Sequence, residues 1–237
     1  MTKPLQERSA GQAAAVLGAS PPFDVLDAGA LDALARCTQR VRLARGQVYQ
    51  QRGARVEGIV VVTAGFLRIS LSNPQGKRHV VAFLEPGQVF NLLPVVDGGP
   101  AIHDAEAGVD AELLVLPTAA YIGLLRSHPE VGLAAQRVLN DRARRVYDGL
   151  ADAMLLTLAQ RCARSLLQVM DALGEPAAPA GAVIVHLAQG ELADMLGNAR
   201  PVVNRVLRQL QRDGVIELGY QRIVVLQPDA LRRVAGG

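Results

Sequence analysis

Tryptophan is absent from this 237-residue chain, and aromatic residues make up only 3% of it. Because half of the residues are hydrophobic, the core must consist mainly of alanine, valine, leucine and isoleucine. The two cysteines, Cys37 and Cys162, lie far apart in the sequence, which excludes a disulfide framework and a four-cysteine metal site. There is no apolar run of the roughly 18 residues that a membrane span needs, and no secretory leader pattern. We therefore expect a soluble, cytoplasmic protein.

Charge restricts the function less than composition does. Lysine and arginine outnumber aspartate and glutamate by 25 to 22, which gives a net charge of +3 and a pI near 9.2. A balance of this size permits a polyanionic partner without requiring one, because it does not show where the charges lie.

The first half of the chain predicts an arm followed by a β-domain. Residues 1–22 are rich in alanine, glycine, serine and glutamine and end in two prolines, so we expect a flexible N-terminal arm. A short amphipathic helix is predicted over 24–36. Residues 23–127 are predicted to form a β-domain, because Gly/Pro turns separate short β-rich runs, as in a β-barrel or jelly roll. These runs are 47–50, 58–63, 66–72, 79–84, 89–93 and 112–116.

A long helix is predicted to connect this domain to the rest of the chain, within residues 128–156. Its apolar residues alternate spacings of four and three, which is the pattern of a two-stranded coiled coil. We interpret the stripe as a dimer seam, and the alternative is that it packs on the β-domain. The seam consists of Leu139, Ala143, Val146, Leu150 and Ala153.

Residues 157–237 are predicted to form a second, smaller domain. Thr157 and Gln160 have the spacing of a capping box at the start of a helix over 158–173, and a loop follows over 174–181. The remaining pattern predicts a strand over 183–187, helices over 189–196 and 200–213, and a hairpin of 215–218 with 222–226.

The segment QGELADMLGNARPVVNRVLRQLQRD, residues 189–213, carries the functional signal. Two short amphipathic helices joined by a turn at Gly197 form a helix-turn-helix, whose second helix enters the major groove of DNA. The terminal hairpin makes it a winged variant. Arginine forks onto guanine and neutralises phosphate, although a solvated basic face is the simpler alternative. The exposed face of the second helix is predicted to carry Arg200, Asn204, Arg205, Arg208 and Arg212.

From about residue 24 to 226 the chain resembles the bacterial family of the cyclic-AMP receptor protein and the fumarate–nitrate reductase regulator (Crp/Fnr). The resemblance rests on Gly46, Gly53, Gly65 and Pro86-Gly87 at the β-roll turns, on the long helix, and on LGNARPVVNRVLRQLQRDGVI. It implies an α+β fold with a double-stranded β-roll that serves as the sensor domain, a dimerisation helix and a winged helix-turn-helix. It also implies a homodimeric transcription factor, not an enzyme, that reads an inverted repeat in double-stranded DNA and has RNA polymerase as a further partner.

The resemblance also implies DNA contacts. Arg200 and Arg205 match the family's base- and phosphate-contacting arginines, and Gln189 matches a phosphate-contacting position. Pro201 stands where the family commonly has a glutamate that can accept from cytosine N4, so we expect a changed or relaxed preference at that base pair. The predicted DNA-binding set is Gln189, Arg200, Pro201, Asn204, Arg205 and Arg208.

The sensor domain lacks the family's cyclic-nucleotide residues. Leu92 stands where the Glu would be, Ala101-Ile102 stand where the Arg-Ser pair would be, and residues 80–120 contain no lysine or arginine. A phosphate would find nothing there to offset its desolvation, so we predict no cyclic-AMP binding in the usual mode. Arg142 and Arg145 on the long helix could still serve an acidic ligand. The candidate effector pocket is Asn91, Leu92, Ala101, Ile102, Arg142, Val146 and Tyr147.

Other sensing modes stay open. An iron–sulfur cluster is excluded because two cysteines cannot hold it. Haem requires an axial ligand, for which His79 and His103 are the only β-roll candidates. A hydrophobic effector, and a ligand-independent DNA binder whose β-roll is only a scaffold, are further alternatives. An enzyme on the β-roll is disfavoured, because the sequence has no closely spaced histidines and no G-x-S-x-G or H-E-x-x-H motif.

Overall fold

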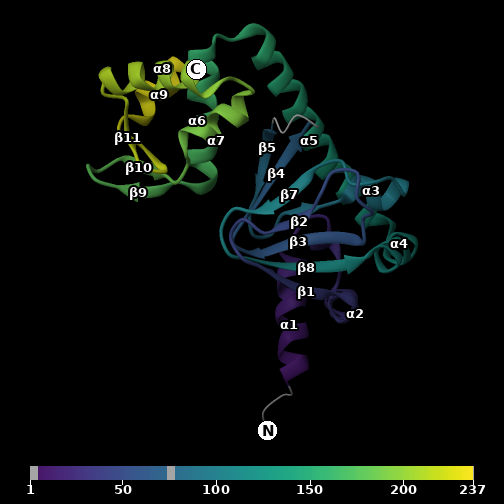
Figure 1. Cartoon of the computed structure of the whole chain (residues 1–237). Coiled ribbons are helices and arrows are strands. Elements are labelled where there is room, and N and C mark those ends of the chain that lie inside the picture. Colours follow the sequence, from purple (N-terminus) through teal and green to yellow (C-terminus); the bar gives the residue numbers. More distant parts are fainter. Residues whose placement is uncertain (1–4, 74–77, 237) are drawn as a thin grey trace. The chain divides into compact units, whose positions relative to one another are not determined.

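The computed structural model describes residues 5–73 and 78–236, which form two compact units. Among the described residues, the first unit contains 5–71 and 82–145, and the second contains 72–73, 78–81 and 146–236. The α+β fold expected from the sequence is confirmed: a β-roll, a long helix and a helix-turn-helix follow one another along the chain (Figure 1). No helix in the described residues is long and apolar enough to cross a membrane.

Two four-stranded antiparallel sheets form the β-roll. One has the order β1 (Gln39–Leu43), β8 (Ala111–Pro117), β3 (Gly58–Ala64), β6 (Val89–Phe90). The other has the order β2 (Val48–Gln50), β7 (Asp104–Ala107), β4 (Leu67–Ser72), β5 (Arg78–Leu84). The predicted strand over 89–93 is wrong beyond Phe90, because helix α3 (Leu92–Asp97) begins there.

Strand β3 shows how the apolar runs divide between two cores. Its residues alternate, as they must in a strand: Val60 and Val62 pack in one cluster with Leu67 of β4, whereas Ile59 and Val61 pack in another with Phe23 and Tyr121 of the helical layer. The strand is therefore buried on both faces, which explains its continuous hydrophobic run. The helical layer comprises α1 (Leu5–Gly18), η1 (Phe23–Val25), α2 (Ala28–Cys37), α4 (Thr118–Ser127) and the start of α5 (Pro129–Leu155).

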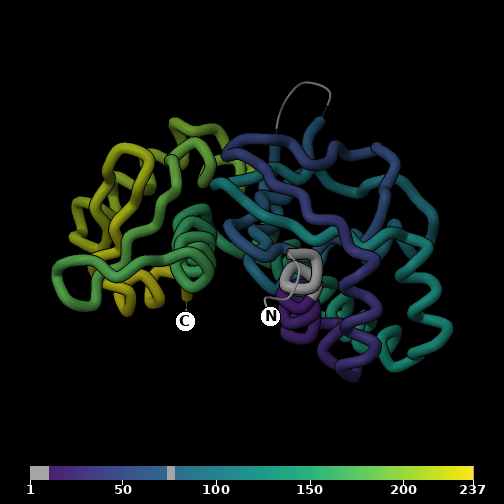
Figure 2. Tube along the Cα trace, turned by 90° about the horizontal axis from the view of Figure 1, so that it is seen from below, coloured from purple at the N-terminus to yellow at the C-terminus, as the bar shows by residue number. Residues whose placement is uncertain are grey.

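The prediction of a flexible arm over residues 1–22 is wrong for the part that the structure describes. Residues 5–18 form α1, which lies beside α2 (Figure 2), and the side chains of Ala13 and Leu17 are buried in the helical core. Alanine has the highest helix propensity, and Ala13, Val16 and Leu17 share one face of the helix. Residues 1–4 of the predicted arm lie outside the described residues. The single helix predicted over 24–36 is two elements, because Asp27 caps α2 by accepting from the Ala30 N–H at 2.8 Å.

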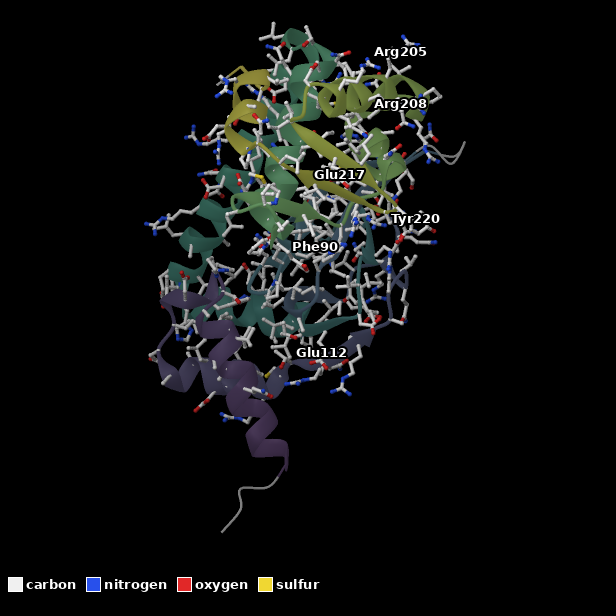
Figure 3. The ribbon with its side chains drawn as sticks, turned by 90° about the vertical axis from the view of Figure 1, so that its left-hand side faces the viewer. Phe90, Glu112, Arg205, Arg208, Glu217 and Tyr220 are labelled. Carbon is white, nitrogen blue, oxygen red and sulfur yellow. The ribbon has the colours of Figure 1, made fainter. Side chains whose placement is uncertain are left out.

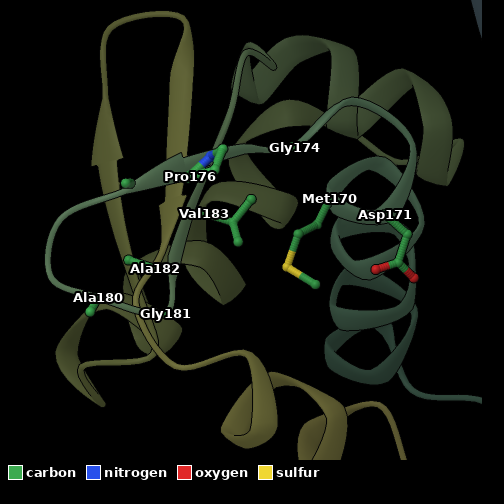
Figure 4. Close-up of a pocket in the computed structure, with 9 residues that line it drawn as sticks. Met170, Asp171, Gly174, Pro176, Ala180, Gly181, Ala182 and Val183 are labelled. Carbon is green, nitrogen blue, oxygen red and sulfur yellow. The ribbon is translucent and has the colours of Figure 1, made fainter.

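The second unit is a small α/β domain. Helix α6 (Leu158–Leu173) begins at the predicted capping box, in which the Thr157 N–H donates to Gln160 Oε1 at 3.0 Å. The sheet has the order β11 (Ile216–Gly219), β12 (Arg222–Val225), β10 (Ala182–Val185), β9 (Glu175–Ala177), so part of the loop predicted over 174–181 is a strand. Helix α9 (Pro228–Val234) was not predicted. A shallow hollow lies between the end of α6 and β10, lined on its two sides by Met170 and Val183 (Figure 4).

Candidate functional site

The helix-turn-helix forms as the sequence predicts. Helix α7 (Gln189–Leu196) ends at Gly197, whose φ of 63° is the left-handed conformation that glycine adopts at no steric cost. Helix α8 (Arg200–Arg212) follows, and the facing side chains of Leu192, Leu196, Val203 and Leu207 are buried. The Leu196 carbonyl at the end of α7 accepts two side-chain hydrogen bonds, from a guanidinium nitrogen of Arg161 on α6 at 2.7 Å and from Asn198 Nδ2 in the turn at 2.9 Å. The turn between the helices is thus held from both sides.

Five of the predicted DNA-binding residues lie together on the outer face of α8. Arg205 and Arg208 project away from the domain (Figure 3), and Arg200 is also exposed. No acidic side chain in the described part of the chain pairs with these three arginines, whereas Arg212 donates to the Gln209 side chain. They are therefore free to meet an anion. A shallow depression on this face is lined by Arg200, Pro201, Asn204, Arg205, Arg208 and Arg212.

Two polar side chains of the predicted set are placed differently from the arginines. Gln189 begins α7 and is half-buried. Asn204 is also half-buried, and its Oδ1 atom is buried without a hydrogen-bond partner. An unpaired buried polar atom costs about 1–3 kcal/mol. A partner in the depression that brings a donor to this amide would relieve the cost.

The hairpin of β11 and β12 supplies candidate residues that the sequence analysis did not single out. Tyr220 at its tip exposes 90% of its surface, and the neighbouring Gln221 has a φ of 52°. Arg222 on β12 is also exposed. The hairpin was predicted, but only the structure shows that the tyrosine is not needed for packing. An exposed aromatic side chain next to an arginine suits contact with a nucleic-acid backbone or base.

Three residues of the candidate effector region of the β-roll, Asn91, Leu92 and Ala101, are buried. Leu92 and Ala101 are 1% and 2% exposed, and Leu92 belongs to the helical core. Asn91 is buried in the left-handed conformation and exchanges two side-chain hydrogen bonds with Gln50, at 2.8 and 3.2 Å. Ile102, by contrast, is 38% exposed. Leu92 and Ala101, which stand at two of the family's nucleotide-binding positions, are therefore buried, whereas Ile102 is not.

Arg142 on the long helix contacts the strand that precedes this region. Its guanidinium donates to the Val89 carbonyl, and burial together with the neighbouring Arg145 lowers its pKa. Burial, Arg142 and Arg52 lower the pKa of His103, whereas Asp104 raises it. His103 is half-buried and His79 is exposed on β5. Val146 and Tyr147, also predicted to line the pocket, belong to the second compact unit and are 71% and 72% exposed.

These elements define a class: a β-roll domain joined through a long helix to a DNA-binding winged helix-turn-helix. Residues 40–128 match the family described as a cyclic nucleotide-binding domain, and residues 160–234 match the Crp-like helix-turn-helix domain. The chain belongs to the Crp/Fnr family and is a DNA-binding transcriptional regulator, as predicted, and not an enzyme.

Relatives match over nearly the whole chain. The CRP-like cAMP-activated global transcriptional regulator of Mycobacterium tuberculosis is 26% identical over 93% of this chain and 98% of its own. The cyclic AMP receptor protein of Thermus thermophilus is 28% identical over 92% and 98%. Among solved structures, a CRP/FNR-family transcriptional regulator from Thermus thermophilus superposes with a TM-score of 0.70 and 26% identity, covering 84% of this chain and 99% of its own.

Proposed function

We propose that the chain acts as a homodimer that reads an inverted repeat in double-stranded DNA without binding cyclic AMP in the usual mode. The observation that carries the first part is the state of the seam on α5. Leu139 packs against the core of the first unit, as the alternative interpretation of the stripe expects. The other four seam residues are exposed, and they are Ala143, Val146, Leu150 and Ala153. Val146 is 71% and Leu150 is 55% exposed.

An exposed apolar seam of this kind needs a partner, and a second copy supplies one. Residues at spacings of four and three on one helix face interdigitate with the same face of a second helix in a coiled coil. A twofold dimer places two copies of α8 in successive major grooves and reads two half-sites about one helical turn apart. We extend the proposal to domain boundaries of 23–127, 128–156 and 157–237, to the cytoplasm as location, and to contact with RNA polymerase. The last of these rests on the family resemblance alone.

The DNA sequence that the dimer selects tests the proposal. Selection from a random duplex library should return an inverted repeat occupied by two chains, with no strong cytosine preference at the base pair that faces Pro201. Proline has no acceptor for cytosine N4. The variant Pro201→Glu should gain that preference by about 1–3 kcal/mol per half-site, measured by competition between matched duplexes. Single half-sites bound by one chain would contradict the dimer, and a cytosine preference in the wild type would contradict the role of Pro201.

The second part of the proposal concerns cyclic AMP. A bound nucleotide phosphate needs a guanidinium and hydroxyl donors, and the family's positions for these are the buried Ala101 and the apolar Ile102. Leu92, at the position of the family's ribose-binding Glu, is packed in the core and offers no acceptor. Residues 80–120 contribute carboxylates and no basic side chain other than His103.

Titration calorimetry of the dialysed protein with cyclic AMP should therefore show no micromolar binding. The cyclic AMP receptor protein of Thermus thermophilus provides the comparison under the same conditions. A dissociation constant in the micromolar range for this chain, or a cyclic-AMP-dependent rise in its affinity for the selected DNA, would overturn this part of the proposal and leave the dimeric DNA binding intact.

A further inference from the structure

Arg142 lies at a particular place on α5. The turns before it pack in the core between the helical layer and the β-roll through Val131, Ala135, Val138 and Leu139. The residue after it, Ala143, begins the exposed part of the seam. Within the first compact unit, Arg142 thus joins the packed part of α5 to the start of its exposed seam.

The hydrogen bond that anchors Arg142 is made at the start of the region where a nucleotide would be expected to bind. The Arg142 guanidinium donates to the backbone carbonyl of Val89 on β6, two residues before the buried Asn91. Asn91 in turn is fixed by its paired hydrogen bonds to Gln50 on β2. Leu92 and Ala101, in the same region, are also buried. The long helix is therefore tied by a charge-assisted hydrogen bond to the strand that leads into these buried residues.

We propose that Arg142 is a positioning residue that takes over the part of an effector, holding α5 in its DNA-binding arrangement so that operator binding needs no small molecule. This inference rests on the proposed dimeric DNA binding. A ligand shifts a conformational equilibrium only through its different affinities for the two states. A hydrogen bond within the chain favours one state in the same way, but unlike a ligand it is present in every molecule.

The hydrogen bond between the Arg142 guanidinium and the Val89 carbonyl is difficult to break unless another partner replaces it. A half-buried guanidinium that loses its acceptor keeps the cost of its desolvation, and nothing in residues 80–120 is basic enough to replace it at the Val89 carbonyl. Removing the guanidinium frees the helix turn that leads into the seam, so the two copies of α8 no longer keep one fixed spacing. Affinity for an inverted repeat then falls, although each helix-turn-helix still folds.

The test compares Arg142→Met, which keeps the apolar stem without the donors, with Arg144→Met, which removes the same charge from an exposed position on the same helix. Arg142→Lys restores a donor. Dialysed wild-type protein whose native mass spectrum shows no bound small molecule should bind the selected operator fully. Fluorescence anisotropy should show affinity about 5- to 50-fold weaker for R142M, unchanged for R144M and largely restored for R142K.

A local readout reports whether the guanidinium has left its place. Because Arg142 lowers the pKa of His103, proton NMR should show a higher His103 pKa in R142M than in the wild type, with no change in R144M.

Four results would overturn the proposal. They are equal operator affinity of R142M and wild type, an equal loss in R144M, a ligand in the purified protein whose removal abolishes binding, and loss of the folded state in R142M, which would make Arg142 a purely structural residue. A wild-type chain that is monomeric or fails to bind an inverted repeat would instead refute the proposed function.

Discussion

Replacing Arg205 with glutamate is expected to abolish sequence-specific DNA binding while leaving the protein folded and dimeric. Arg205 is exposed on the outer face of α8 and has no acidic partner in the described residues. The change therefore breaks no ion pair within the described residues. It removes a base or phosphate contact and adds repulsion from the DNA backbone. With about 1–3 kcal/mol lost at each of two half-sites, affinity should fall by roughly 30-fold to 10⁴-fold.

The matched comparison is Arg233→Glu on α9, which makes the same change of charge at another exposed position of the same domain. Anisotropy titrations at two salt concentrations separate the effects. Arg233→Glu should lower affinity modestly and equally for operator and random duplex, whereas Arg205→Glu should remove the difference between them. Retention of operator preference in Arg205→Glu would show that α8 does not read the bases through this face.

The helix-turn-helix was predictable because its signals are local. Helical spacing of Leu192, Leu196, Val203 and Leu207, with a glycine between the two groups, requires no knowledge of distant residues, and all four side chains are buried. The same holds for the capping box at Thr157. The packing of the candidate effector region was harder to predict from the sequence. The sequence showed which nucleotide-binding side chains are missing, but the pairing of Asn91 with Gln50 joins residues 41 positions apart.

The errors have a common physical origin. The first residues were expected to form a flexible arm because they are rich in alanine, glycine, serine and glutamine. Instead, residues 5–18 form α1, and Ala13 and Leu17 are buried in the core beneath the helical layer. Tertiary burial decides such segments, and an isolated helix of this length is marginal. The hydrogen bond of Arg142 to Val89 joins residues 53 positions apart, so the spacing of residues along the chain could not predict it. The family resemblance suggested that Arg142 lies beside the effector region, but it did not identify the Val89 carbonyl as its partner.

Leu150→Glu is expected to produce a monomer that no longer binds the inverted repeat with high affinity. Leu150 is 55% exposed in the single chain. In the predicted dimer seam it lies between Val146 and Ala153 on the apolar stripe. In a dimer the two glutamates would face each other across the seam, buried and without partners. An uncompensated buried charge costs about 3–5 kcal/mol, so the dimer dissociation constant should rise by roughly 10²- to 10³-fold or more.

Leu155→Glu provides the same substitution off the seam. Leu155 is 80% exposed and lies nine residues after Val146, about 180° around the helix. Sedimentation equilibrium should show a dimer for wild type and Leu155→Glu and a monomer for Leu150→Glu, with operator affinity lost only in the last. Circular dichroism should show the same helix content in all three, since each domain has its own core. A dimeric Leu150→Glu protein would mean that the copies associate through a different surface, and the exposed apolar stripe on α5 would then need another partner.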